Sequence, residues 1–374
     1  MNIPSLPYAS MRAYPELRWI DLRSPAEFER DHVPGAINVP LFDDEQRAAV
    51  GTLYHQDSKE SAYEQGLAFA KSAMPSLLGK LLGREIEAKE WKPCFEQLGE
   101  HLSAGQESVE LTSQMPAAKP TVALYCWRGG MRSRSVAALV QALGETVLLL
   151  EGGYKNYRGW VLAQTEQLSL PPLVVLRGPT GVGKTEILTR LENQLPGSTL
   201  CLESLAEHRS SILGAVGKHP VSQPAFDSRL LQRIAEMGPG PWFVEGESRK
   251  VGDVILPVQL FQAMDCGHHW RLEAQTETRV RNLMDDYLAD AGAVDAIRKQ
   301  LPMLERRIGQ KWVGQLDQWM LEGKAAEVTE VLLERYYDPL YAHSDEQRTW
   351  SGHFEVESLD LIKDLLRERA RISG

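Results

Sequence analysis

The stretch LVVLRGPTGVGKT, residues 173–185, decides the fold of the second half of the chain. Its apolar start predicts a buried strand over residues 173–177, and its second part matches G-x-x-x-x-G-K-[ST] from Gly178 to Thr185. A helix is expected from Lys184 to Gln194. Strand, glycine loop and helix in this order predict an α/β domain that binds phosphate groups.

Each residue type in the loop has a role in binding phosphate. Glycines let backbone N–H groups converge on phosphate oxygens, the lysine adds a cation, the helix N-terminus adds its dipole, and the threonine hydroxyl can ligate Mg²⁺. The predicted phosphate-binding residues are Gly178, Gly181, Gly183, Lys184 and Thr185. The alternative is a chance glycine turn, which the flanking strand and helix disfavour. The motif does not identify the ligand, because a nucleoside triphosphate and a diphosphate ester offer the same oxygens.

An acidic signal follows further along the chain. The segment WFVEGE, residues 242–247, predicts a short strand over residues 242–244, followed by Glu245 and Glu247. A carboxylate at the end of a strand beside the phosphate loop is a candidate ligand for Mg²⁺. Either carboxylate could instead cap a loop or pair with Arg249.

A second loop with chemical potential lies in TVALYCWRGGMRS, residues 121–133. A buried strand over residues 121–125 delivers Cys126, and a helix is expected from Ser135 to Leu143. Such a loop can wrap its N–H groups around an anion, while Arg132 closes the ring and the helix dipole favours the thiolate. We predict Cys126 and Arg132 as catalytic residues. The predicted anion loop between them comprises Trp127, Arg128, Gly129, Gly130 and Met131. The alternative is an inert buried cysteine at a strand end.

Three further segments give the cysteine loop a context. IDLRSPAEF (residues 20–28) and HVPGAIN (residues 32–38) resemble the N-terminal signature of rhodanese domains, and GGYK (residues 152–155) resembles a later segment of that family. The resemblance implies that Cys126 carries sulfur or selenium as a persulfide or perselenide. Sulfurtransferase rhodaneses hold four residues between Cys and Arg, whereas five separate Cys126 from Arg132, as in related Cys-dependent phosphatases. The longer spacing suits a larger tetrahedral oxyanion.

The whole chain resembles the tRNA 2-selenouridine synthase family, which joins a rhodanese domain to a P-loop domain. Besides CWRGGMRS (residues 126–133), the stretches that support the resemblance are ESLAEHRSS (203–211), VEGESR (244–249) and YYDPLY (336–341). The resemblance implies a tRNA substrate with a 2-thiouridine derivative at the wobble position of the anticodon. The product would carry selenium in place of that sulfur. Geranyl diphosphate would first alkylate the sulfur, and selenophosphate would then supply selenium as geranyl thiol departs.

The resemblance also implies a division of labour. Cys126 and Arg132 would handle selenophosphate or carry the selenium, while the P-loop would grip the diphosphate of the geranyl donor. A selenophosphate-supplying enzyme is an expected partner. Two other functions stay open: a Cys-dependent phosphatase or reductase fused to an NTPase, and a regulatory module that senses a nucleotide. The spacing from Cys126 to Arg132 suggests the first, and the presence of Cys126 disfavours the second.

Length and composition bound the architecture. The chain has 374 residues, of which 43% are hydrophobic and 25% charged, and this favours two globular domains. We expect a rhodanese-like α/β domain over residues 1–165 with a helical insertion at about 48–119, of which 103–120 would be a surface loop. A P-loop NTPase-like α/β domain is expected over residues 172–374, mainly helical beyond about residue 275.

Cysteine content, charge and hydropathy exclude several classes of protein. The 4 cysteines form no CxxC pair and support neither a disulfide framework nor a structural zinc site. The net charge of −10 argues against a generally basic coat but leaves a local RNA-binding stripe open. No apolar run is long enough to cross a bilayer and no signal peptide is evident, so a cytoplasmic location is expected. The candidate RNA contacts are Arg128, Arg134, Lys155, Arg158, Arg279, Arg281, Arg298, Arg306, Arg307 and Lys311, with Tyr336 and Tyr337 as candidates for base stacking.

Overall fold

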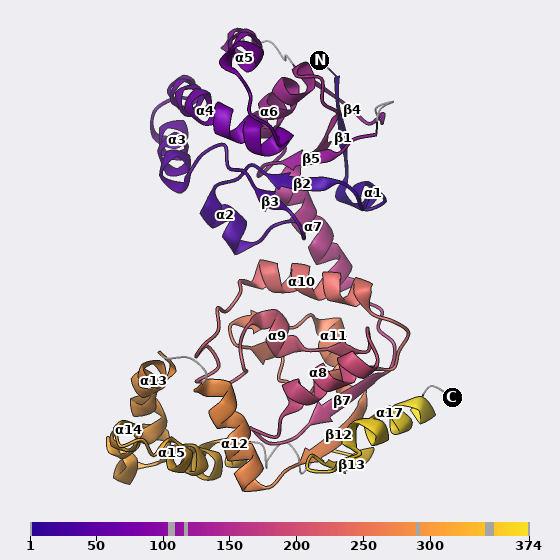
Figure 1. The fold of residues 1–374 in the computed structure, drawn as a ribbon, viewed down its shortest axis with the longest axis vertical. Helices are drawn as coiled ribbons and strands as arrows, with labels where there is room; N and C mark the ends of the chain where they lie inside the picture. Colours follow the sequence, from indigo (N-terminus) through magenta and orange to yellow (C-terminus); the bar gives the residue numbers. More distant parts are fainter. Residues whose placement is uncertain (1, 104–108, 116–118, 289–291, 341–347, 373–374) are drawn as a thin grey trace. The chain divides into compact units, whose positions relative to one another are not determined.

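The computed structural model describes residues 2–103, 109–115, 119–288, 292–340 and 348–372. The chain divides into two compact units, residues 1–164 and 165–374 (Figure 1). Each unit has its own parallel sheet with helices packed against it, which confirms the predicted α/β fold class.

The sheet of the first unit has six strands in the order β3-β2-β5-β6-β1-β4, and all its pairs are parallel. In chain order the strands are β1 (Asn2–Leu6), β2 (Arg18–Asp21), β3 (Ile37–Asn38), β4 (Glu110–Thr112), β5 (Val122–Tyr125) and β6 (Val147–Leu150). The central strands β5 and β6 are buried along their whole length, as continuous apolar runs predict. The sequence did not predict β1 or β4. Strand β4 lies in the stretch expected to be a loop, and it forms because it pairs with β1, a partner far away in the sequence.

Helices surround this sheet, and three of them form the insertion. In chain order they are α1 (Tyr8–Met11), α2 (Pro25–Arg30), α3 (Asp44–Gln56), α4 (Lys59–Leu82), α5 (Ala88–Ser103), α6 (Met131–Ala142) and α7 (Gly153–Glu166). The insertion consists of α3, α4 and α5. Asp43 caps α3 in a reciprocal capping box with Gln46, Ser58 caps α4, and Gly83 ends α4 in the left-handed conformation. The loop segments 104–108 and 116–118 lie outside the described residues.

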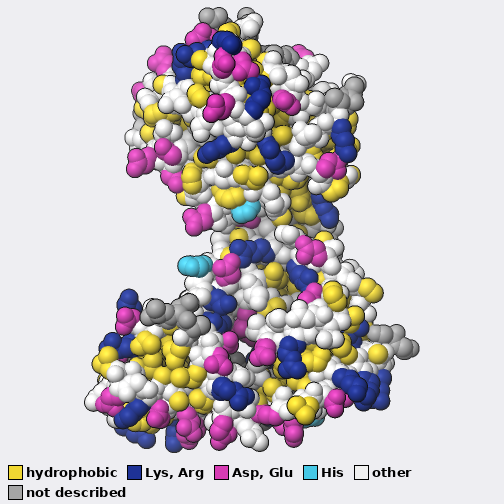
Figure 2. Space-filling view, in the orientation of Figure 1, with side chains coloured by type: hydrophobic (Ala, Val, Ile, Leu, Met, Phe, Trp, Pro, Cys, Tyr) yellow, Lys and Arg dark blue, Asp and Glu magenta, His cyan; other side chains and the backbone are white. Residues whose placement is uncertain are grey.

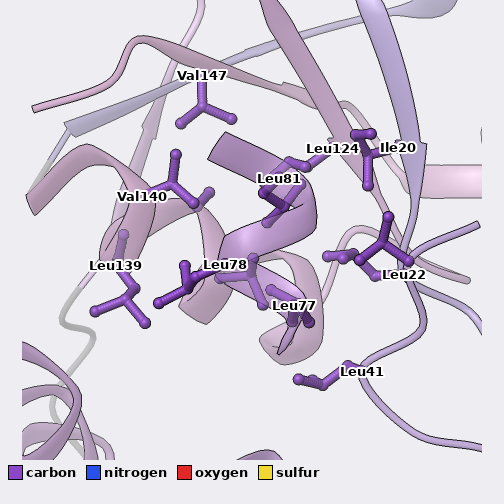
Figure 3. Packing of buried hydrophobic residues seen from close by; sticks show 14 of the residues in the cluster. Ile20, Leu22, Leu41, Leu77, Leu78, Leu81, Leu124, Leu139, Val140 and Val147 are labelled. Carbon is purple, nitrogen blue, oxygen red and sulfur yellow. The ribbon is translucent and has the colours of Figure 1, made fainter. Parts of the chain in front are cut away.

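Helix α4 is part of the core of the first unit. In Figure 3 its residues Leu77, Leu78 and Leu81 lie between strand residues such as Leu124 and the Leu139 side of α6. All three leucines are at most 2% exposed, and each such side chain contributes roughly 1.5–3 kcal/mol of burial. The insertion is therefore integral to the fold of this unit.

The second unit is built on a five-stranded parallel sheet in the order β13-β12-β7-β9-β8. Its strands are β7 (Leu173–Arg177), β8 (Thr199–Leu200), β9 (Trp242–Glu245), β12 (His268–Glu273) and β13 (Gly352–Glu355), with a separate hairpin of β10 (Lys250–Val251) and β11 (Val254–Ile255). The strand predicted over residues 173–177 is confirmed as β7. The strand expected at 242–244 is β9, and it lies directly beside β7.

The helices of the second unit cover this sheet and continue to the C-terminal region. They are α8 (Lys184–Gln194), α9 (Leu202–Ala206), α10 (Gln223–Glu236), α11 (Val258–Asp265), α12 (Thr276–Tyr287), α13 (Ala293–Ile308), α14 (Gln315–Leu321), α15 (Ala325–Leu332) and α17 (Leu361–Ile372), with a 3₁₀ turn at Gln310–Trp312 and a π-helical turn at Leu333–Tyr337. The mainly helical C-terminal region is as predicted, except that β13 returns to the sheet and pairs with β12. Helices α13, α14 and α15 share a hydrophobic core of their own, which includes Leu301, Leu304 and Leu316.

Charge is distributed over both units. On the face shown in Figure 2, Lys and Arg side chains are interspersed with Asp and Glu side chains. Within the described part of the chain, no helix combines the length and the apolar character needed to cross a membrane.

Candidate functional site

The phosphate loop joins the carboxyl end of β7 to the start of α8, where the motif requires it. Gly181 has a φ of +82°, and a Cβ there would lie 2.8 Å from the carbonyl oxygen of Arg279. A Cβ on Gly178 would lie 2.5 Å from the carbonyl oxygen of Leu272. Backbone approaches this close leave room for glycine alone.

The N-terminus of α8 is open to an anion. Its N-cap is Gly183, and no side chain among the described residues caps it. Lys184 Nζ donates a hydrogen bond to the Gly178 carbonyl at 3.1 Å, and the Thr185 hydroxyl donates to Glu203 Oε2 at 3.3 Å. The helix N-terminus with its dipole and a lysine therefore lie at one place, and this arrangement suits a phosphate group.

Three glutamates gather beside this loop. Glu245 ends β9 and is fully buried, and its Oε1 accepts a hydrogen bond from the backbone N–H of Glu203 at 2.5 Å. Glu247 is also buried. The sequence predicted Glu245 and Glu247 here, but it did not single out Glu203. The signal for Glu203 was weak because the strand before it, β8, has only two residues.

The three carboxyl groups hold protons more tightly than exposed glutamates. Burial raises the pKa of Glu203 to about 7, and the charge of Glu247 adds to this, while Lys184 and Thr185 oppose it. Burial also raises the pKa of Glu245 well above its usual range, with repulsion from Glu203 and Glu247 as further causes. Burial raises the pKa of Glu247, and Lys184 opposes the shift. Negative charge is thus unfavourable here unless a cation joins the cluster.

The raised pKa of Glu203 predicts a pH dependence of stability. Between pH of about 4.5 and 7 the folded chain keeps a proton on Glu203 that the unfolded chain releases, so the free energy of unfolding should fall as the pH rises. For this carboxyl the loss is at most about 3 kcal/mol. Replacing Glu203 with Gln should reduce the loss without removing it, because Glu245 and Glu247 still titrate. Urea unfolding of wild type and variant at pH 5 and pH 8 would measure it.

The matched control for this prediction is Glu236→Gln, which changes an exposed carboxyl on α10. The control should show the wild-type difference in unfolding free energy between the two pH values. An equal difference in Glu203→Gln and wild type would contradict the proposed environment of Glu203.

A cleft of about 370 Å³ opens at the phosphate loop. Lys184 and Thr185 line it on one side, and Arg209 and Asn282 line it from other elements. Asn282 Nδ2 also donates a hydrogen bond to the Gly181 carbonyl at 2.9 Å, so α12 supports the loop directly. Neither Arg209 nor Asn282 was predicted from the sequence as a residue of this cleft. Its size and mixed charge suit a small phosphorylated ligand.

The cysteine loop lies in the first unit at the carboxyl end of β5. Cys126 is 2% exposed, and its Sγ lies 3.2 Å from Ser133 Oγ in the first turn of α6. Beneath the loop, the Tyr154 N–H donates to the Cys126 carbonyl at 2.9 Å. A Cβ on Gly153, where φ is +62°, would lie 2.3 Å from the same carbonyl oxygen. The GGYK segment therefore fixes the backbone of the loop.

The other residues of the loop are placed around its rim. Gly130 is the N-cap of α6, and no side chain in the described part of the chain caps this helix end. Trp127 is 38% exposed and stacks on Tyr154, with ring centroids 5.4 Å apart. Arg128 and Met131 are exposed, and Gly129 has a φ of +63°. The loop thus combines a buried thiol, an open helix N-terminus and an exposed aromatic ring.

Arg132 forms an ion pair with a glutamate of another helix. Its Nη1 is 3.6 Å from Glu27 Oε2 and makes no hydrogen bond to any described residue. Its side chain lines a cavity between α3, α4, α5 and α6. The structure thus does not bring Arg132 into contact with Cys126, although both belong to the same loop and helix.

A buried polar network supports the loop from below. Arg23 Nη2 lies 2.6 Å from Asp21 Oδ2 and also donates to the Asp31 carbonyl at 2.6 Å. The Tyr154 hydroxyl donates to Asp31 Oδ2 at 2.7 Å. Burial raises the pKa of Tyr154, and the charge of Asp31 contributes to the shift. Residues of the rhodanese-like signature therefore position the turn that holds Cys126.

Several candidate RNA contacts serve internal roles. Arg279 is buried, pairs with Asp338 at 2.5 Å and donates from Nε to the Thr180 carbonyl at 2.9 Å. Arg298 pairs with Asp317 at 2.7 Å. Tyr337 is buried in the core of the C-terminal helices, and Tyr341 lies outside the described residues. Arg279 therefore supports the phosphate loop, and its charge is already paired.

Comparisons with known proteins identify a family for each half of the chain. A family model described as the tRNA 2-selenouridine synthase AAA domain matches residues 171–371, and a rhodanese-like domain model matches residues 8–67. The rhodanese match ends within the helical insertion and does not reach Cys126.

Full-length relatives extend the likeness over most of the chain. The tRNA 2-selenouridine synthases of Pseudomonas savastanoi pv. phaseolicola and Pseudomonas syringae pv. tomato are each 32% identical to it, with 94% of both chains covered. The tRNA 2-selenouridine synthase of Bordetella petrii is 30% identical, covering 88% of this chain and 87% of its own. With these relatives and the match over residues 171–371, the chain belongs to the tRNA 2-selenouridine synthase family.

Proposed function

We propose that this protein modifies tRNA by replacing the sulfur of a wobble-position 2-thiouridine with selenium. The observation that carries the proposal is the presence, in one chain of this family, of an open phosphate loop at Lys184 and a structured cysteine loop at Cys126. Two chemical steps with two different anionic donors would require two such sites.

The first step is geranylation at the phosphate loop. A C–S bond forms between the thiouridine sulfur and the first carbon of geranyl diphosphate, the C–O bond to diphosphate breaks, and the N3 proton of the uridine passes to the released diphosphate or to water. The departing diphosphate carries the developing negative charge. Lys184 and the uncapped N-terminus of α8 are placed to stabilise it.

Mg²⁺ fits the chemistry of this cleft when a phosphate ligand shares it. Thr185 and the neighbouring glutamates offer hard oxygen ligands, and a cation would favour the charged form of Glu203, whose pKa is raised chiefly by burial and further by Glu247. The described residues contain no group of three or more metal-ligating side chains arranged to hold a metal alone. Thr185 and one carboxylate would therefore hold Mg²⁺ together with the phosphates, and the ion would supply positive charge to the leaving group.

The second step is selenium transfer at the cysteine loop. Selenium of selenophosphate attacks C2 of the uridine, the C–S bond breaks, and geranyl thiol leaves; hydrolysis of the Se–P bond then releases phosphate. The open N-terminus of α6 and Arg128 supply positive charge for the donor, and the Cys126 thiol contacts the selenophosphate as its selenium attacks. The expected partner for this step is an enzyme that supplies selenophosphate.

The exposed ring of Trp127 provides a place for the uridine. It stacks on Tyr154, which is itself fixed to Asp31, so one face of a rigid aromatic platform remains open next to Cys126. Aromatic rings of this kind hold single-stranded bases by stacking. The platform would place the modified base over the loop that delivers selenium.

Reconstitution with the purified protein tests the function. An anticodon stem-loop RNA with 2-thiouridine should become S-geranylated with geranyl diphosphate alone, and should yield 2-selenouridine only when selenophosphate is added as well. Mass spectrometry of the digested nucleosides measures both products. An unchanged RNA, together with rapid hydrolysis of an aryl phosphate, would instead support the Cys-dependent phosphatase that the spacing from Cys126 to Arg132 suggests.

A further inference from the structure

The helical insertion of the first unit lines a cavity that neither proposed step has used so far. It lies between α3, α4, α5 and α6 and has a volume of about 540 Å³. This is larger than the cleft at the phosphate loop and falls within the range of small-ligand sites. Its lining includes the exposed side chain of Tyr54, so the space is open to solvent and a ligand can reach it.

The sequence of α4 explains why the space is there. Along its first half the buried positions Ala62, Gly66 and Ala70 repeat every four residues, lie on one face and line the cavity. Along its second half Leu77, Leu78 and Leu81 fill the core (Figure 3). The same helix thus packs tightly at one end and leaves room at the other.

The walls of the cavity suit a hydrocarbon. Apolar side chains come from every surrounding element, among them Phe42, Leu67, Phe95, Leu98, Val136 and Leu139. A cavity lined in this way offers few hydrogen bonds to water and favours an apolar ligand. A short branched chain would gain about 0.8 kcal/mol for each CH₂ group that it buries.

The charged residues at the cavity have one sign. Those that line it are Arg47, Lys59 and Arg132, and no Asp or Glu is among the described lining residues, although the chain as a whole carries a net charge of −10. Glu27 lies near Arg47 and Arg132, at 3.7 and 3.6 Å. Arg132 Nη1 makes no hydrogen bond to the described residues, so the guanidinium keeps an unused N–H donor beside the cavity. The ligand should therefore join a hydrocarbon chain to an anionic group.

The cavity also shares a wall with the cysteine loop. Met131 and Arg132 line it, and the next residue, Ser133, contacts Cys126 Sγ at 3.2 Å. A chain anchored in the cavity would hold the group attached to it close to this loop. Two species in the proposed reaction have this form, geranyl diphosphate and the S-geranylated tRNA, and only the tRNA is proposed to react at the cysteine loop.

We infer that the cavity between α3, α4, α5 and α6 binds the isoprenoid chain of the S-geranylated wobble uridine while selenium replaces the sulfur. This inference rests on the proposed function. The basic residues at the cavity face the anticodon phosphates, and the chain holds the leaving thiol group at the cysteine loop. The geranyl group thus contributes to RNA binding and also makes the sulfur a better leaving group.

The test compares two anticodon stem-loop RNAs, one with S-geranyl-2-thiouridine and one with S-methyl-2-thiouridine, in binding to the full-length protein by fluorescence anisotropy. Wild type should bind the geranylated RNA about tenfold or more tightly than the methylated RNA. Ala70→Leu and Ala62→Leu fill the cavity and should remove this preference without changing the affinity for the methylated RNA. Ala68→Leu, on the exposed side of α4, is the matched control and should keep it. Thermal unfolding of each variant shows whether the fold is intact.

The outcomes separate this inference from the proposed function. The inference is wrong if both cavity variants still bind the geranylated RNA more tightly than the methylated RNA. It is also wrong if wild type binds the two RNAs equally well, even if the protein makes 2-selenouridine. If the cavity variants lose the preference for geranylated RNA but the wild type makes no 2-selenouridine, the cavity binds the chain and the proposed reaction is wrong. If both RNAs bind alike and free geranyl diphosphate binds in a manner that Ala70→Leu abolishes, the cavity serves the free donor, and the inference is wrong.

Discussion

The variant Lys184→Ala is expected to geranylate 2-thiouridine RNA at about one hundredth of the wild-type rate or less. Lys184 is the only cation within the phosphate-loop motif itself, and its side chain lines the cleft. Without it, the diphosphate loses a charge-assisted contact as the C–O bond breaks. The initial rate of S-geranyl product formation, followed by mass spectrometry at saturating RNA, measures the effect.

The design of this experiment isolates the first step. Lys363→Ala, on the exposed side of α17, is the matched control and should keep the wild-type rate. RNA that is geranylated beforehand should still be converted to 2-selenouridine by Lys184→Ala, because that step uses the other unit. A wild-type geranylation rate in Lys184→Ala would show that the phosphate loop does not bind the geranyl donor.

The variant Cys126→Ala is expected to lose selenium transfer by about a thousandfold or more while it still forms S-geranylated RNA. The side chain is buried, and alanine fits the same space, so the loop backbone should persist through its contacts with Tyr154. What the substitution removes is the thiol. Geranylated RNA should therefore accumulate, and nucleoside mass spectrometry would detect both the missing product and the excess intermediate.

The matched control for the thiol is Cys266→Ala. Cys266 is exposed after α11 in the second unit and should be dispensable for both steps. If Cys126→Ala makes 2-selenouridine at the wild-type rate, the cysteine loop only positions substrate, and the chemical role assigned to its thiol is wrong.

The parts of the fold that local pattern determines could be predicted from sequence. Strand β7, the loop and α8 form where expected because an apolar run, glycines at close backbone approaches and a helix start all lie within one short stretch. The strand that carries Glu245 also forms where the sequence predicts it, since β9 is apolar and pairs directly with β7.

The strands that were not predicted from the sequence form because they pair with strands far away along the chain. Strand β4 pairs with β1, and β13 pairs with β12, in both cases at the edge of a sheet. Both are short and only partly buried, so they lack the continuous apolar run that identified β5.

The same limit applies to the candidate sites. Sequence spacing suggested that Arg132 closes a ring around Cys126, but in the structure Glu27, from another helix, pairs with it. Glu203 joins the phosphate site through tertiary contacts with Thr185 and Glu245, which no local motif encodes. Individual side-chain partners thus depended on packing between elements.

If the proposed function is right, this protein puts selenium into tRNA in the cell. Mass spectrometry of wobble nucleosides tests this in tRNA from cells that lack the gene, complemented with the wild-type gene or with an empty vector. We expect 2-selenouridine to disappear in the deletion, 2-thiouridine to take its place, and only the wild-type gene to restore selenium. An unchanged content of 2-selenouridine in the deletion strain would contradict it.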